Sequence, residues 1–191
     1  KDENKNITFI HHPIYNNLSK NAEKTKEFKY DILIWGAITP YKGVDKFLNY
    51  LERNNLLNKY KICILGKIKN NHLKKEILRY KSRNVEVINE FVDDKKLEGY
   101  ILVSKIVLFT YTPTNTFASG SLMMSLSYGS NIIGPNVGSF KDLSEEKLIK
   151  IFNSYNDLIN KIDLSLNAQK NDLDLVNKFI KINSWNSFGK E

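Results

Sequence analysis

Cysteine, histidine and arginine are scarce in this chain of 191 residues. The single cysteine, Cys63, excludes a disulfide framework, and the apolar run around it predicts a buried thiol in a reducing compartment. Because only three scattered histidines accompany it, we expect no structural metal site. No apolar run approaches the roughly 18–20 residues that a membrane-spanning helix needs. The polar first residues lack a starting methionine and a signal peptide, so we expect a piece of a longer protein.

The net charge is +8, and lysine supplies almost all of the positive side chains. Such an excess favours an anionic partner, which a nucleotide, a nucleic acid or an acidic membrane surface would provide. An alternative is that the abundance of Lys, Asn and Ile reflects an AT-rich genome rather than a binding surface. The three arginines form no stripe, which argues against nucleic-acid binding.

Short apolar runs alternate with amphipathic segments along the chain. Strands are predicted at 7–11, 31–36, 61–66, 85–88, 105–111, 131–134 and 148–152, and helices at 44–51, 70–81, 93–101, 119–128, 158–162 and 173–180. This alternation is typical of βαβ units, and near-continuous apolar strands indicate that both faces of the sheet are covered. The sequence therefore predicts an α/β fold, a parallel sheet with helices on both faces. Such sheets bind ligands beyond the carboxyl ends of their strands.

The first candidate binding segment runs from Gly36 to Gly43, directly after a predicted strand. A tight loop follows the strand, and Lys42 lies at the start of the next helix. A helix N-terminus offers unpaired N–H groups and positive partial charge, so a lysine there suits a phosphate ligand. The alternative is that Lys42 is a solvated lysine of the first turn and that Gly43 merely eases the turn.

The second candidate segment, residues 114–121, is rich in small and hydroxylated side chains and precedes an apolar helix. We expect the N–H groups of Gly120 and Ser121 to point toward the strand ends. The Ser119 hydroxyl would either bind a phosphate oxygen or cap the helix. The segment is neither a P-loop nor a GxGxxG fingerprint, which disfavours kinases, GTPases and ordinary dehydrogenases.

In this order, the motifs resemble those of the C-terminal domain of GT-B glycosyltransferases of the family 4 type. That family shows a strand, Gly-Arg, four residues, Lys-Gly and then a helix. Here Gly36, Ala37, Lys42 and Gly43 stand at the same spacing. The resemblance extends over about residues 7–143, and it implies a Rossmann-like fold that binds a nucleotide-diphosphate sugar.

Three later segments carry the resemblance further. Residues 124–133, MSLSYGSNII, align with the family pattern E-A-M-A-x-G-x-P-V-I. Residues 135–142 look like the family's following loop, and Trp185 looks like the aromatic residue of its closing helix. The resemblance implies that 1–191 is a single nucleotide-sugar-binding domain, whose N-terminal acceptor domain is absent from this chain.

The chain also departs from the family pattern. Ala37 replaces the family's arginine, and Thr116 and Met124 stand where it has two glutamates. The turn 119–121, Ser-Gly-Ser, is instead similar to that of a subgroup that includes bacterial polysaccharide glycosyltransferases, some mannosyltransferase-like. In that subgroup the turn would hold the diphosphate through backbone N–H groups, so that a glutamate becomes unnecessary.

The resemblance implies a role for each candidate residue. The donor diphosphate would be held by Gly36, Lys42, Ser119, Gly120 and Ser121. Gly66 would allow the donor to approach the backbone, Phe91 and Val92 would receive the base, and Tyr111, Thr112 and Asn115 would face the donor sugar. The alternatives are core packing for Phe91, and strand-end packing or turn formation for the last three.

Two adjacent histidines, His11 and His12, precede Pro13 and Tyr15. Consecutive side chains of an extended segment point to opposite sides, which argues against joint metal ligation. A similar His-Pro-x-Tyr segment lies where the family's chain enters its second domain, so we expect a structural role near a hinge.

The sequence thus predicts the donor half of a hexosyltransferase-like glycosyltransferase of bacterial surface polysaccharide synthesis, inactive as this piece alone. Lys42 and helix N-termini would stabilise the leaving diphosphate without a metal or other cofactor. The acceptor would be a saccharide or a lipid-linked molecule bound through the N-terminal domain, in the cytoplasm or at the inner membrane surface. The alternatives are a catalytically inactive GT-B-like interaction domain, a flavodoxin- or receiver-like nucleotide-binding module, and a basic nucleic-acid-binding domain.

Overall fold

The structure, a computed structural model, describes residues 13–15, 17, 27–112, 119–167 and 172–188. At its centre lies a six-stranded parallel sheet with the strand order β3-β2-β1-β4-β5-β6. The strands are β1 (Tyr30–Trp35), β2 (Ile62–Leu65), β3 (Val85–Ile88), β4 (Ser104–Leu108), β5 (Ile132–Pro135) and β6 (Lys150–Phe152). This confirms the predicted sheet. The strand order reverses direction between β1 and β4, as in a Rossmann-like doubly wound fold.

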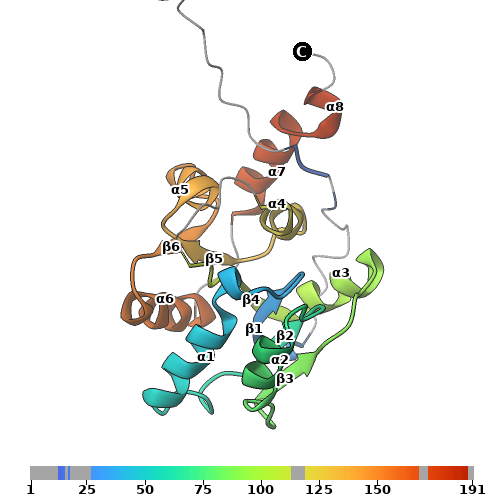
Figure 1. The fold of residues 1–191 in the computed structure, drawn as a ribbon. Helices are drawn as coiled ribbons and strands as arrows, with labels where there is room; N and C mark the ends of the chain where they lie inside the picture. Colours follow the sequence, from blue (N-terminus) through green and yellow to red (C-terminus); the bar gives the residue numbers. More distant parts are fainter. Residues whose placement is uncertain (1–12, 16, 18–26, 113–118, 168–171, 189–191) are drawn as a thin grey trace, which may run out of the picture.

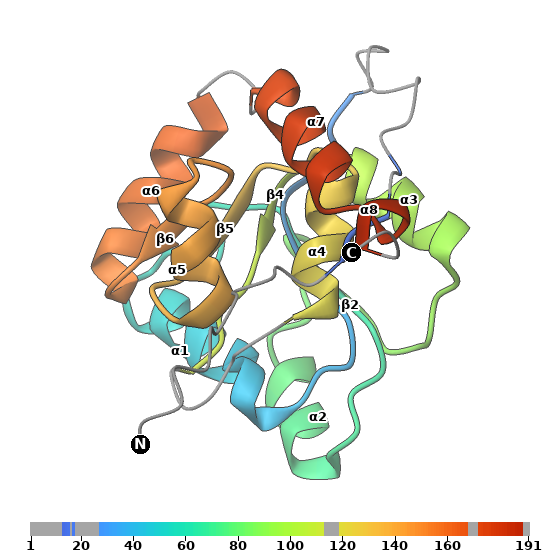
Figure 2. The same ribbon diagram turned by 90° about the horizontal axis from the view of Figure 1, so that it is seen from above.

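Helices cover both faces of this sheet, as Figures 1 and 2 show. The helices are η1 (Pro40–Lys42), α1 (Val44–Arg53), α2 (Asn71–Leu78), α3 (Asp94–Leu102), α4 (Gly120–Ser127), α5 (Gly138–Glu145), α6 (Tyr155–Asn167), α7 (Leu173–Ile182) and α8 (Trp185–Phe188). Buried residues of α1, α2 and α6 form one hydrophobic cluster, and those of α3, α4, α5 and α7 form another. Among the described residues, no helix is both long and apolar enough to span a bilayer.

The alternation of side chains along β4 and the residue after it, Phe109, shows how the sheet separates the two clusters. Ile106 and Leu108 belong to the cluster on the α1 face, whereas Val107 and Phe109 belong to the one on the α4 face. All four side chains are at most 2% exposed. Successive strand residues point to opposite faces, so a strand covered on both sides must be apolar throughout.

Side-chain caps mark where several helices begin, among them α2, α3 and α4. The side chains of Asn70, Asp93 and Ser119 accept hydrogen bonds from the backbone N–H groups three residues further on, at α2, α3 and α4. Each cap satisfies an N–H group that has no partner within the helix. The starts of α3 and α4 agree with the helix starts predicted from the sequence.

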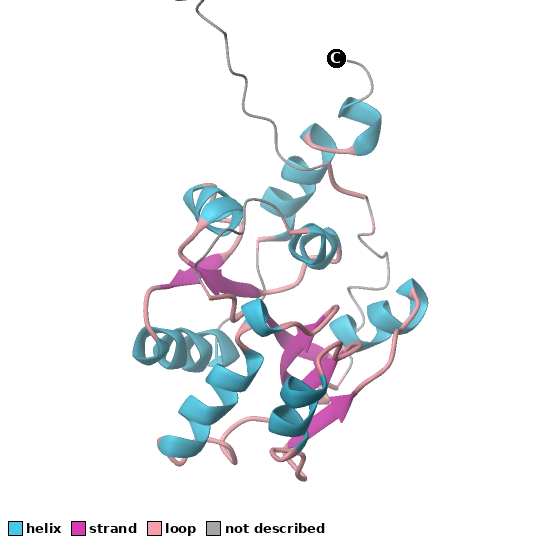
Figure 3. Cartoon of the chain, viewed as in Figure 1, coloured by secondary structure: helices cyan, strands magenta, loops and turns pink. Residues whose placement is uncertain are grey.

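The segment after β5 differs from its prediction. Residues 135–142 were expected to form a loop, but α5 begins at Gly138 and is drawn as a helix in Figure 3. No side chain caps this helix, and only Phe140 and Leu143 are buried in it. The local signals of a helix start and of an apolar face are therefore weak, and packing against the sheet decides the conformation. The strand predicted at 7–11 lies outside the described residues.

Candidate functional site

A pocket of about 340 Å³ lies at the carboxyl ends of β1 and β4, where the strand order reverses direction. This is the position at which open parallel sheets bind ligands. Its lining residues are Trp35, Gly36, Ala37, Tyr41, Lys42, Tyr111, Ser119, Gly120 and Ser121. The structure thus brings together all five residues predicted to hold a diphosphate, from two segments far apart in the chain.

One wall of the pocket is the segment from Gly36 to Lys42, which leaves the end of β1. The Lys42 Nζ atom donates a hydrogen bond to the Trp35 carbonyl at 3.1 Å. Gly36 has a φ of +103°, and a Cβ atom there would lie 2.7 Å from Lys42 Nζ. A glycine is therefore favoured by the backbone conformation, and its missing side chain leaves room for the ammonium group.

The Lys42 side chain is buried, and only 4% of the residue is exposed. The alternative considered for Lys42, a solvated lysine of the first turn, is therefore wrong. Burial lowers the pKa of Lys42 to about 8, because the charged form loses its hydration. Among the described carboxylates, none lies within ion-pair distance of Lys42. A buried charge without a protein counterion is costly, so the pocket is suited to an anionic ligand.

The opposite wall is the start of α4. Ser119 Oγ accepts a hydrogen bond from the Leu122 N–H at 3.2 Å, so the capping role considered for Ser119 is confirmed. The same oxygen lies 3.2 Å from Ser121 Oγ, and both serines lie on the pocket wall. The first turn of α4 thus presents hydroxyl groups, unpaired helix N–H groups and the positive end of the helix dipole.

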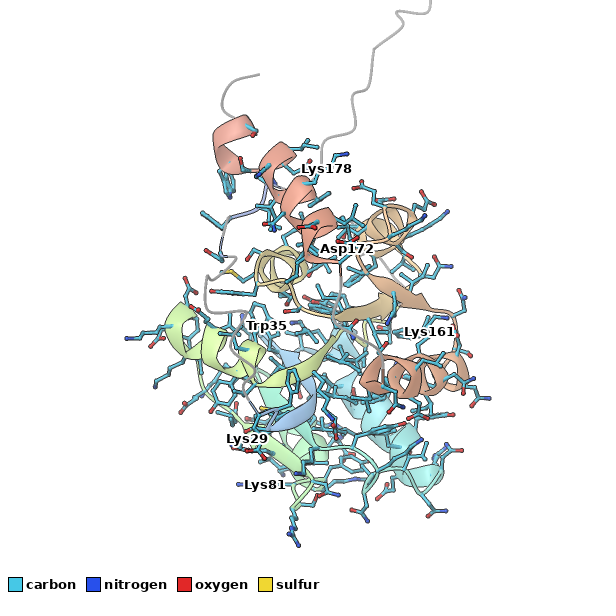
Figure 4. The ribbon with its side chains drawn as sticks, turned by 180° about the vertical axis from the view of Figure 1, so that it is seen from behind. Lys29, Trp35, Lys81, Lys161, Asp172 and Lys178 are labelled. Atoms are coloured by element: carbon cyan, nitrogen blue, oxygen red, sulfur yellow. The ribbon has the colours of Figure 1, made fainter. Side chains whose placement is uncertain are left out.

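Three aromatic residues complete the lining. Tyr111 follows β4, and its hydroxyl lies 3.3 Å from Ser119 Oγ and 3.2 Å from Ser121 Oγ. Trp35 lies at the end of β1, beside α4, as Figure 4 shows, and its Nε1–H group donates to Ser125 Oγ at 2.8 Å. Tyr41 contacts the Tyr111 ring edge-on, with centroids 5.5 Å apart. Trp35 and Tyr41 had not been singled out, although both adjoin residues that had been, and Ala37 had been named only as the residue that replaces the family's arginine.

Not all of the tentative site residues enter the lining. Gly66 has a φ of +135°, and a Cβ atom there would lie 2.0 Å from the Gly36 carbonyl oxygen, so it allows two strand ends to approach each other. Phe91 is 86% exposed, so the alternative of core packing is wrong for this residue, whereas Val92 packs against the core. Both lie outside the pocket lining.

Thr112, which follows β4, was predicted to face the donor sugar. Thr112 donates from its N–H and from Oγ1 to the Tyr41 carbonyl, which ties the end of β4 to η1. This contact supports the turn-forming alternative, and Thr112 is not part of the lining. Asn115 and Thr116 lie outside the described residues.

Carboxylates are missing from the described pocket wall. Met124, which replaces a family glutamate, contacts Asn17 through its sulfur atom. Ser125 follows it, is fully buried, accepts from Trp35 and donates to the Ser121 carbonyl at 2.8 Å. In the described part of the chain, no three His, Cys, Asp or Glu side chains group closely enough to bind a metal ion.

The predicted structural segment around Pro13 lies beside the last helix. Ile14 is 1% exposed and pairs with Ser184, while the Tyr15 ring lies 6.0 Å from that of Trp185. His11 and His12 lie outside the described residues. The segment and the start of α8 thus pack against each other, and neither belongs to the pocket lining.

Comparison with known proteins identifies the fold. No protein-family model matches the sequence, and no curated protein does. Among solved structures, the chain is similar to AviGT4, a glycosyltransferase involved in avilamycin A biosynthesis, with a TM-score of 0.69 and 12% identity over 94% of this chain and 54% of that one. It is also similar to Anabaena HepE in complex with UDP and glucose, with a TM-score of 0.60 and 13% identity over 80% of this chain and 44% of that one.

A third similar structure is itself a domain. It is the C-terminal domain of LpcC, a group 1 family glycosyl transferase from Francisella tularensis, with a TM-score of 0.56 and 17% identity over 95% of both chains. The chain spans about half the length of AviGT4 and HepE. The fold is thus the Rossmann-like α/β fold of GT-B glycosyltransferase domains. At these identities the likeness concerns the fold.

Proposed function

We propose that this chain is the donor-binding domain of a glycosyltransferase and that its pocket holds the diphosphate of a nucleotide sugar. The observation that carries the proposal is the buried Lys42 ammonium group facing the start of α4 in one pocket. Both features attract phosphate, the lysine by its charge and the helix by its N–H groups and dipole. HepE, which shares the fold, was solved with UDP and glucose.

The same features define the chemical role. When a sugar leaves its nucleotide diphosphate, negative charge develops on the leaving phosphate. Lys42 and the first turn of α4 would stabilise that charge by electrostatics and hydrogen bonds, without a divalent cation. We place Gly36, Ser119, Gly120 and Ser121 around the same diphosphate, because they line the pocket with Lys42.

The remaining proposals concern the nucleobase, the acceptor and the location of the enzyme. Phe91 is an exposed aromatic side chain just after β3, where its ring is free to stack on a nucleobase. The acceptor, a saccharide or a lipid-linked molecule, would bind to an N-terminal domain of the full-length protein. We place the complete enzyme in the cytoplasm, with peripheral contact at the inner membrane surface, in the synthesis of bacterial surface polysaccharide.

Calorimetric titration of the 191-residue chain with UDP, GDP, ADP and their sugars tests the proposal. We expect one nucleoside diphosphate to bind with an affinity that is unchanged by EDTA. The Lys42→Met variant should lose this binding, whereas the Lys46→Met variant, which changes an exposed lysine one turn away, should retain it. Equal affinities for the two variants would contradict the proposal.

The second candidate is a catalytically inactive GT-B-like interaction domain. The observation in its favour is Met124, which stands where the family has a glutamate. This candidate predicts that none of the nucleoside diphosphates binds, while the fold remains intact by circular dichroism.

A further inference from the structure

A series of hydrogen bonds connects the two walls of the pocket, which are the segment 36–42 and the first turn of α4. Lys42 Nζ donates to the Trp35 carbonyl at 3.1 Å, and Trp35 Nε1–H donates to Ser125 Oγ at 2.8 Å. Ser125 Oγ in turn donates to the Ser121 carbonyl at 2.8 Å. Tyr111 closes this chain of contacts into a ring, because it touches both Ser121 and Lys42.

The Tyr111 ring faces the ammonium group of Lys42, with Nζ 5.4 Å from the ring centroid. The face of an aromatic ring is electron-rich and attracts a cation, most strongly where water is excluded. Both side chains are at most 5% exposed, and the described pocket lining contains no carboxylate. Tyr111 therefore provides part of the electrostatic stabilisation that a carboxylate would otherwise give to Lys42.

The Tyr111 hydroxyl forms a triangle with Ser119 and Ser121, with oxygen–oxygen distances of 3.2–3.3 Å. Each hydroxyl carries one proton, and without a ligand these protons are shared within the triangle. An anion in the pocket would accept them, because hydroxyl groups rotate toward the stronger acceptor. The triangle thus holds donors ready for phosphate oxygens.

Packing alone does not account for a tyrosine at this position. The Tyr111 ring makes edge-on contacts with Phe109 and Phe140 at 5.6 and 5.5 Å, and a phenylalanine would make the same contacts. A buried tyrosine hydroxyl needs a hydrogen-bond partner, and here both partners are serines of the pocket wall.

We propose that Tyr111 is the positioning residue of the anion site: its ring holds the Lys42 ammonium group, and its hydroxyl holds the Ser119–Ser121 turn in a donating arrangement. This inference rests on the proposed function and deepens it. The two halves of the side chain have separable tasks, so Tyr111→Phe and Tyr111→Leu should have different effects.

Titration with inorganic pyrophosphate at pH 7 tests the hydroxyl. We expect Tyr111→Phe to weaken binding about tenfold, as the loss of one hydrogen bond in a charged site does, without a fall in melting temperature of more than a few degrees. Tyr128→Phe removes another buried tyrosine hydroxyl outside the pocket and should bind pyrophosphate as the wild type does. Affinity of Tyr111→Phe within twofold of the wild type would overturn the role of the hydroxyl.

An NMR titration of ¹³Cε-labelled lysines tests the ring without any ligand. The Lys42 signal is identified by its loss in Lys42→Met. Tyr41 and Tyr111 are the titratable groups that line the pocket with Lys42. We expect the midpoint of Lys42 to fall by about half a pH unit or more in Tyr111→Leu and to stay unchanged in Tyr111→Phe. An unchanged midpoint in Tyr111→Leu would overturn the role of the ring.

The two experiments also separate this inference from the proposed function. If the wild-type chain binds neither pyrophosphate nor any nucleoside diphosphate, the proposed function fails, together with the role of the hydroxyl. The NMR titration of Lys42 then still decides whether the Tyr111 ring stabilises the charged form of Lys42. Should Tyr111→Leu fail to fold, the Tyr111→Phe binding result decides the proposal by itself.

Discussion

Replacing Lys42 with methionine should make this protein more stable while removing the diphosphate binding that we propose. Burial lowers the pKa of Lys42 from 10.5 to about 8. Since one pKa unit corresponds to about 1.4 kcal/mol, the charged lysine costs about 3 kcal/mol at pH 7, where it is protonated both folded and unfolded. Methionine fills a similar volume without the charge.

The loss of the hydrogen bond to the Trp35 carbonyl offsets about 1 kcal/mol of this gain. A net stabilisation of about 2 kcal/mol remains, which for a domain of this size raises the melting temperature by about 4–8 °C. The affinity for diphosphate should change in the opposite direction and fall. Losing a charge-assisted hydrogen bond to phosphate costs about 1.5–3 kcal/mol, or roughly 10- to 150-fold in affinity.

The pH dependence of stability gives a sharper test. Between pH 8 and 10.5 the unfolded chain still holds a proton on Lys42 that the folded chain has released. The contribution of Lys42 to stability therefore rises with pH through this window and is constant below pH 8. Urea denaturation of the wild type, Lys42→Met and Lys46→Met at pH 7 and pH 10 measures it.

The difference in unfolding free energy between Lys42→Met and the wild type should be largest at pH 7 and should nearly vanish at pH 10. Lys46 is exposed, so Lys46→Met should leave stability within about 0.5 kcal/mol of the wild type at both pH values. A Lys42→Met variant that is less stable than the wild type at pH 7 would refute the burial argument. It would mean that the ammonium group has a compensating partner.

Three further predictions concern the strand ends and the pocket. Gly66→Ala should cost about 2–5 kcal/mol of unfolding free energy, because its Cβ atom would collide with backbone, whereas Gly99→Ala, in an open helix position, should gain about 0.5–1 kcal/mol. Thermal melts compare the two, and equal melting temperatures would contradict the close approach. In Trp185→Phe, the fluorescence of the remaining Trp35 should change when pyrophosphate is added, and a constant spectrum would place the ligand elsewhere. Pyrophosphate affinity should fall as the pH rises above about 8, because the Lys42 ammonium group loses its proton there, and calorimetry at pH 7 and 9.5 would show no difference if the charge were irrelevant.

Local patterns allowed most of the elements to be predicted. The apolar run at Ile62–Leu65 could form a strand buried on both faces, and Asp93 could cap a helix, because both features depend on neighbouring residues. The two candidate segments at the strand ends followed from the same reasoning. Where local signals were weak, as at α5, the sequence did not predict the helix that packing stabilises.

These local patterns did not predict the order of the strands in the sheet. β1 pairs with both β2 and β4, so the ends of β1 and β4 lie side by side although two strands, β2 and β3, separate them in sequence. This adjacency places Tyr111 between Lys42 and the Ser119–Ser121 turn and encloses the lysine. Phe91, after β3, lies at the far edge of the same sheet and stays exposed.

By itself, the sequence determined that a parallel sheet would form and which strand ends would carry the candidate phosphate-binding residues, because hydrophobic periodicity, glycines and helix caps act over a few residues. Only the tertiary structure decided that Lys42 is buried, that Tyr111 and Trp35 complete its surroundings, and that Gly66 serves a contact between strands. Burial, pKa and cation–π contacts depend on residues brought together by strand crossovers, and no local pattern records which strands become neighbours.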